Sequence, residues 1–229
     1  MIGRRLVIGT LLGAVGIVMS GCSHNPSYTY RFKMTVVIET PSGLKTGSSV
    51  YEVGAGNKTR LTSEEGTRFV WTKGEAVAVD LDNGQTLFTL LKTGALQGDM
   101  ASLSMSALDT AFKYDIVESA ARIVNREGIR SPAEVKQRDY PMLVTFKDLR
   151  DPKSVQQVDP DKLASSFGPG YALKSITVQV TDEPVTTGIE KRLASIGVKP
   201  DHGLDQTYGV TANPTLSQQL GYNDFIRRY

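Results

Sequence analysis

The stretch RFKMTVVIET, residues 31–40, alternates apolar side chains with polar ones. A period of two places the apolar side chains on one face of a β-strand, which predicts a strand with one buried and one exposed face. The turn-forming residues Pro41, Ser42 and Gly43 follow directly, and they favour a reversal of the chain. The apolar members of this strand are Phe32, Met34, Val36 and Ile38.

Several further strands are predicted around this one. Residues 48–53 and 67–72 are patterned as strands, with a turn at the glycine-rich residues 54–57. Residues 75–81 and 85–91 flank Asn83 and Gly84, and Asn-Gly between apolar runs predicts a hairpin with a type I′ turn. Such a turn explains Asn83 and Gly84 without a metal, and the spacing of the acidic residues beside it is not that of an EF-hand calcium loop.

The apolar period changes to three and four residues after Gly98. It predicts an amphipathic helix over residues 106–125, with Ser106 and Asp109 as a capping box and Gly128 as its stop. Residues 131–134 are typical of a second helix start. The other predicted elements are strands at 141–146 and 173–181, a short helix capped by Asp159 and Pro160 that ends by Gly168, and a helix that Thr187 opens and Gly197 closes.

These elements predict an α+β fold, with antiparallel β-hairpins in the N-terminal half and helices interleaved with further strands in the C-terminal half. We expect one domain over residues 31–197. A division into two lobes, a β-rich one at 31–98 and an α+β one at 99–197, stays open. Residues 198–229, rich in glycine, proline, asparagine and aspartate, form a tail that could be docked or frayed.

The N-terminal residues 1–21 have the order of a secretory signal peptide. Arg4 and Arg5 precede an uncharged apolar run at residues 6–19, and the small residues Ser20 and Gly21 follow it. The run is shorter than the ~20 residues of a spanning helix. A permanent membrane span, which would have to include later neutral residues, is the less favoured alternative.

The segment Met19-Ser20-Gly21-Cys22 resembles the lipobox of bacterial lipoproteins, with Met19 where that family usually has leucine. The resemblance implies that Cys22 is acylated, becomes the new N-terminus and anchors the chain to a membrane of the cell envelope. Ser23, in place of aspartate, implies the outer membrane, facing the periplasm. The alternative is a free thiol, because Cys22 is the only cysteine and has no disulfide partner within the chain. Residues 22–30 then form a short tether.

Charge gives no support for a nucleic-acid partner. Removal of residues 1–21 takes two of the 26 basic residues and none of the 24 acidic ones, so the remaining 208 residues carry 24 of each. Nucleic-acid binding favours a clustered surplus of basic residues. A local basic group is expected to be a solvated face, with lipid headgroups or an anionic glycan as the alternative; it comprises Arg126, Arg130, Lys136 and Arg138.

Catalytic candidates are few. Four acids could bind a cation or act as acid and base, although aspartate beside proline or at a helix start is favoured as a backbone cap; they are Asp148, Asp151, Asp159 and Asp161. The histidines are His24, in the tether, and His202, which we interpret as a surface residue. Zinc needs more imidazole or thiolate ligands than this chain offers. We therefore predict no cofactor and no metal site.

Three stretches resemble a group of uncharacterised proteobacterial proteins: residues 34–53, 74–91 and 148–193. This resemblance implies no activity and transfers no functional residue. We expect a non-catalytic envelope lipoprotein that binds or supports an envelope protein partner at the membrane surface. An envelope hydrolase that uses carboxylates and a lipoprotein that binds a small ligand are the alternatives.

Overall fold

The strand predicted at residues 31–40 is the central part of a longer strand, β1 (Ser27–Thr40). The computed structural model describes residues 27–58, 67–93, 99–113, 115–125, 131–207 and 212–228. β1 pairs along its whole length with β2 (Gly43–Asn57), from Ser27 opposite Gly56 to Thr40 opposite Gly43. Residues 27–30, predicted to belong to the tether, are therefore part of the sheet. Residues 1–26, with the predicted signal peptide and Cys22, lie outside the described residues.

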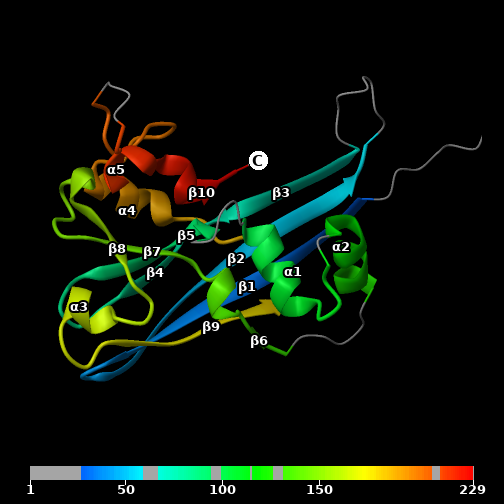
Figure 1. Ribbon diagram of the computed structural model, residues 1–229, viewed down its shortest axis with the longest axis horizontal. Coiled ribbons are helices and arrows are strands. Elements are labelled where there is room, and N and C mark those ends of the chain that lie inside the picture. Colours follow the sequence, from blue (N-terminus) through cyan, green and yellow to red (C-terminus); the bar gives the residue numbers. More distant parts are fainter. Residues whose placement is uncertain are drawn as a thin grey trace, which may run out of the picture.

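β1 lies inside a six-stranded antiparallel sheet with the order β10-β3-β2-β1-β9-β6 (Figure 1). A second, four-stranded antiparallel sheet has the order β4-β5-β7-β8. The remaining strands of the first sheet are β3 (Arg68–Glu75), β6 (Ala133–Glu134), β9 (Ala172–Val180) and β10 (Ile226–Arg227). Those of the second are β4 (Val77–Asp80), β5 (Thr86–Thr93), β7 (Pro141–Phe146) and β8 (Val155–Val158).

The fold is mixed α+β with antiparallel sheets, and each sheet takes strands from both halves of the chain. A boundary at residues 98 and 99 therefore does not separate the two sheets. None of the helices in the described ranges is both long and apolar enough to cross a membrane. The helices are α1 (Met100–Leu108), α2 (Ile116–Asn125), α3 (Leu163–Phe167), α4 (Ile189–Ile196) and α5 (Leu216–Gln219), with 3-10 turns at Gln137–Asp139, Pro152–Ser154 and Tyr222–Asp224.

One connected core lies between the inner face of the long sheet, the second sheet and the helices. The alternating apolar residues of the predicted strand supply its centre, because Phe32, Met34, Val36 and Ile38 are all fully buried. Phe32 stacks on Tyr51 of β2 with ring centroids 5.0 Å apart. Figure 1 shows α1 and α2 side by side over β1 and β2, where they cover this part of the core.

The predicted single helix over residues 106–125 is wrong, because the chain forms two helices there. Asp109 ends α1, and its buried carboxylate accepts hydrogen bonds from the Ala111 N–H and from the Arg122 side chain. Asp115 then caps α2 by accepting from the Glu118 N–H at 3.0 Å. The expected capping box at Ser106 is therefore not formed, and Asp99 caps α1 instead.

The predicted turn at residues 54–57 is also wrong, because these residues continue β2. Gly54 and Gly56 pair with Trp71 and Phe69 of β3. A Cβ on Gly54 would lie 2.2 Å from the Trp71 ring, so this glycine allows an aromatic side chain to lie flat on the sheet. Glycine here therefore marks a close approach and not a change of direction.

Two smaller predictions also need correction. Residues 131–134 start no helix, since Ala133 and Glu134 pair with β9 as an edge strand. The hairpin between β4 and β5 forms, but of its turn residues only Gly84 has a positive φ, 78°, whereas a type I′ turn requires two. Of the C-terminal tail, left open as docked or frayed, residues 216–227 pack on the domain in part, with Leu220, Tyr222, Phe225 and Ile226 buried.

Candidate functional site

Three of the four acids singled out from the sequence cap the backbone. Asp148 accepts from the Arg150 N–H at 2.9 Å, and Asp151 accepts from the Lys153 N–H at 2.9 Å. Asp159 accepts from the N–H of Asp161 at 3.0 Å. Capping is confirmed for Asp151 and Asp159, which stand beside proline, and Asp148 also caps, whereas both carboxylate oxygens of Asp161 accept from the Gln137 side chain at 2.8 Å. The predicted cap of the helix by Asp159 is wrong, because the N-cap of α3 is Lys162, with no side-chain capping hydrogen bond. Across the described ranges, no three His, Cys, Asp or Glu side chains are grouped so that they could hold a metal ion.

His202 lies exposed on the surface, as its sequence context indicated. Its Nδ1 atom is 2.6 Å from the carbonyl oxygen of Pro200 in the same loop. Of the basic group, Lys136 and Arg138 are exposed, and Arg138 approaches its neighbour Asp139 at 3.7 Å. Arg126 and Arg130 lie outside the described residues, as do Cys22, His24 and Gly128.

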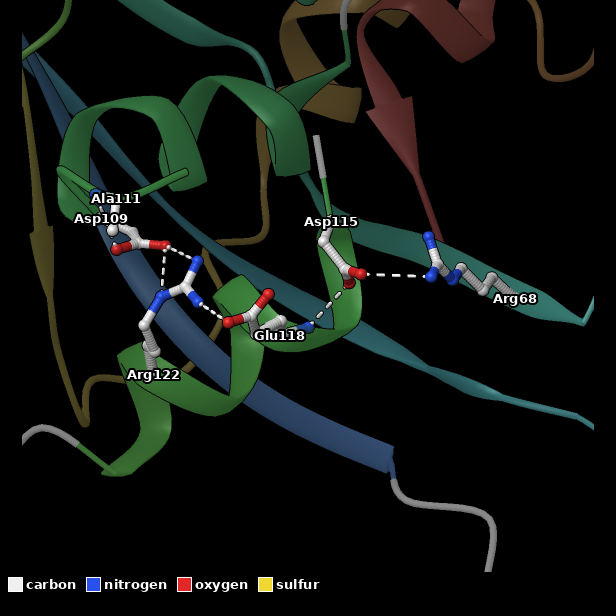
Figure 2. Close-up of polar contacts among 6 residues, drawn as sticks. All are labelled: Arg68, Asp109, Ala111, Asp115, Glu118 and Arg122. Carbon is white, nitrogen blue, oxygen red and sulfur yellow. Dashed lines mark hydrogen bonds and ion pairs between the residues drawn. The ribbon is translucent and has the colours of Figure 1, made fainter. Parts of the chain in front are cut away.

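Two buried carboxylates were not predicted as special. The Asp109 side chain is 0% exposed, and the Arg122 guanidinium donates to Oδ2 from Nε at 2.9 Å and from Nη2 at 2.7 Å. Figure 2 shows Arg122 between Asp109 and Glu118, so one arginine links the end of α1 to α2. Burial disfavours the charged carboxyl, yet the bonds from Arg122 and the Ala111 N–H hold the pKa of Asp109 below its usual value.

The second buried carboxylate is Glu75, at the end of β3. Its two oxygens accept from the N–H groups of Gly188 at 3.0 Å and Ile189 at 2.8 Å. A carboxylate at this place satisfies free N–H groups and complements the positive end of the α4 dipole. The structure thus assigns the cap of α4 to a residue 113 positions away in the sequence and not to Thr187.

A cleft of about 260 Å³ lies beside Glu75, between β3, β10 and the chain that leads into α4. Its walls include the apolar side chains of Val185 and Ile226. Among its charged residues, Glu190 is paired with Arg228, whereas Arg227 has no acidic partner among the described residues. The lining residues are Lys73, Gly74, Glu75, Val185, Thr186, Thr187, Glu190, Ile226, Arg227 and Arg228.

The outer face of the sheet beside this cleft carries an aromatic platform, which we define as Phe69 and Trp71 of β3 lying opposite Gly56 and Gly54 of β2. The Lys73 ammonium lies over the Trp71 ring, 5.3 Å from its centroid. This arrangement is a cation–π contact. Phe69 and Trp71 are both half-buried, so part of each ring is accessible from outside the sheet.

A row of charges borders the platform. Glu52 of β2 binds Arg31 at 3.1 Å and approaches Lys73 at 3.8 Å. Arg31 also donates to the carbonyl oxygens of Asp182 and Glu183, each at 3.3 Å. The segment after β9 therefore crosses the outer face at this row.

The sequence contained only part of the signal for these features. Trp71 and Phe69 were recognisable as strand residues at period two, but their placement on glycines requires the register of β2 and β3. The aromatic platform and its basic neighbours could bind a partner at the surface. The buried carboxylates of Glu75 and Asp109 cap backbone N–H groups. No family model, no curated protein sequence and no solved structure matches this chain.

Proposed function

We propose that this chain is a lipoprotein of the bacterial cell envelope, anchored through Cys22 and facing the periplasm from the outer membrane. Its domain binds or supports a protein partner at that surface without catalysis, and helices alternate with strands in its C-terminal half. The observation that carries the proposal is the position of Cys22, five residues before Ser27, the first residue of β1. Five extended residues reach at most about 18 Å. The domain is therefore held beside its membrane.

The capped acids support a non-catalytic role. The carboxylates of Asp148, Asp151 and Asp159 each accept a backbone N–H, and those of Asp109 and Glu75 bind structural partners. A catalytic acid or base has to reach a substrate proton. These carboxylates are engaged by the protein itself.

The anchor is tested by labelling cells with a radioactive fatty acid. The parent chain is expected to incorporate the label and to fractionate with the outer membrane, and Cys22→Ala should lose both properties. Retention of both by Cys22→Ala would reject the anchor. Crosslinking of the anchored chain through its lysines tests the partner, since a discrete heavier adduct is expected. Recovery of only the uncrosslinked mass, with the lysines modified, would count against a partner.

Binding of a small anion in the cleft is the second candidate function. Arg227 and Lys73 supply positive charge there, and Val185 and Ile226 supply apolar wall. A thermal-shift series with carboxylates and phosphomonoesters tests this function. Stabilisation that Arg227→Ala abolishes would support it, and the absence of any shift in the parent chain would reject it.

A further inference from the structure

The N-terminal end of the long sheet is the end nearest the proposed anchor. Ser27 of β1 lies opposite Gly56 of β2, and Gly56 lies opposite Phe69 of β3. Neighbouring strands are about 4.8 Å apart, so Phe69 lies about 10 Å from Ser27 across the sheet. Because at most about 18 Å of chain separates Ser27 from Cys22, an anchor at Cys22 brings Phe69 close to the lipid.

The side chains at this end suit an interface between water and lipid. Val70 is one of four large apolar side chains that stand out as exposed in the described ranges, and it lies between Phe69 and Trp71 in β3. Tryptophan has an apolar ring and a polar N–H, and it is enriched at the level of the lipid headgroups. Residues 69 and 71 point to one face of the strand and Val70 to the other, so both faces of this edge offer apolar contact.

Two basic side chains of β3 at this end, Arg68 and Lys73, have acidic neighbours. Arg68 pairs with Asp115 at 3.1 Å, and Figure 2 shows this contact between the start of β3 and the start of α2. Lys73 lies over Trp71 and approaches Glu52. With these two charges engaged, contact through Phe69, Val70 and Trp71 does not require anionic headgroups, and a zwitterionic lipid surface is sufficient.

The opposite end of the sheet lies far away. Thirteen residues separate Ser27 from Thr40 in β1, and at 3.3 to 3.4 Å per residue they span about 43 Å. The hairpin tip there packs on the β4–β5 turn, where Thr40 donates to Asp82 at 2.6 Å and Lys45 pairs with Asp82 at 2.6 Å. Leu44, 55% exposed, marks this far end.

We propose that the domain stands on the membrane through the end of the sheet at Ser27, with Phe69, Val70 and Trp71 against the zwitterionic lipid headgroups and the β1–β2 hairpin directed away. This orientation rests on the proposed anchoring through Cys22. Trp71 is the only tryptophan of the chain, so its fluorescence reports on this contact directly.

The test uses the full-length protein purified from cells and reconstituted with phosphatidylcholine vesicles, with and without bromine on the acyl chains near the headgroups. Bromine quenches tryptophan only on close approach. We expect loss of Trp71 emission in brominated vesicles, unchanged by added salt. Flotation of the same vesicles separates the two proposals. Protein that does not float rejects the anchor and the orientation, whereas protein that floats without quenching rejects the orientation alone.

Two variants sharpen this test. Val70→Asp puts a charge into the proposed contact and is expected to reduce quenching while flotation persists, whereas Leu149→Asp changes another exposed apolar residue and should leave quenching unchanged. Leu44→Trp adds a second emitter at the far tip, so the quenched fraction of total emission is expected to fall. Equal quenching at both positions would show that the domain lies flat and would overturn the proposal.

Discussion

The ring of Trp71 lies directly over Gly54 on the neighbouring strand. A Cβ built on Gly54 would be 2.2 Å from Trp71 Cε2 and 2.5 Å from Nε1, which is inside van der Waals contact. The two residues are cross-strand partners in the register of β2 and β3. The glycine and the tryptophan therefore form one packing unit, in which the ring covers a backbone that has no side chain of its own.

Gly54→Ala is expected to destabilise the domain, because the added methyl group displaces the Trp71 ring. Overpacking of this kind costs about 1–3 kcal/mol. Urea unfolding measures the change. Trp71→Ala removes the clash, so the double variant should be more stable than the sum of the two single effects predicts. Strict additivity would contradict the packing unit.

Arg122→Met is expected to destabilise the fold by about 3 kcal/mol, because it leaves the Asp109 carboxylate buried without its cationic partner. The pKa of Asp109 should rise, which NMR titration of its carboxyl carbon measures. Arg68→Met is the matched control. It breaks the exposed pair with Asp115, for which a loss of no more than about 1 kcal/mol is expected. Equal losses in the two variants would refute a special role for the buried pair.

Glu75→Gln should loosen the start of α4. The amide turns one acceptor into a donor that faces an N–H of Gly188 or Ile189 and also removes the charge at the helix N-terminus. A loss of about 1–2 kcal/mol is expected. Hydrogen exchange should show faster exchange of amides in α4 than in α2. Glu52→Gln, which alters only the half-exposed charge row, is the control.

Acid should weaken the contact between β4 and α4. Hydrogen bonds from Arg192 at 2.6 and 2.7 Å lower the pKa of Asp80 below that of the unfolded chain. The stabilisation is therefore complete above the unfolded pKa of about 3.9 and is lost as pH falls through the folded pKa. Unfolding free energies of the parent and Asp80→Asn should converge as pH drops below about 4. Arg192→Gln should show the same convergence, and a gap that stays constant with pH would exclude this pair as its cause.

Phe225 holds the C-terminal segment in the core. It is fully buried, with ring centroids 5.9 Å from Phe88 and 6.2 Å from Phe146. Phe225→Ala is expected to cost about 3–5 kcal/mol. Calorimetry measures the drop in melting temperature. Arg227→Ala, two residues further on, should have a much smaller effect, and a comparable drop would contradict the assignment of this anchoring to Phe225.

The sequence predicted strand positions correctly where a local alternation of apolar and polar residues specifies the strand. Residues 141–146 form β7 as predicted, and residues 173–181 match β9 to within one residue, because alternation alone specifies a strand with one buried face. The break after Leu108 was missed because the apolar period continues across it. The helix ends at Asp109, whose carboxylate binds Arg122, 13 positions further along the chain. The period of the apolar residues does not indicate such a pair.

The candidate site was less predictable than the fold. The turn acids Asp148, Asp151 and Asp159 could be interpreted locally, because an aspartate caps an N–H two residues ahead of it. Glu75 and the platform of Trp71 depend on partners brought together by strand register. A sequence alone does not specify which glycine an aromatic ring will cover, so these features required the structure.

The pairing of β1 with β9 joins the two halves of the chain, and β10 completes the long sheet with residues 226 and 227. The long sheet is therefore completed only after residues 226 and 227 have left the ribosome, and such contacts between distant segments form slowly. In an exported protein such a delay is useful. A chain whose long sheet is completed late would stay threadable through a translocation channel for longer, which suits the export that we propose.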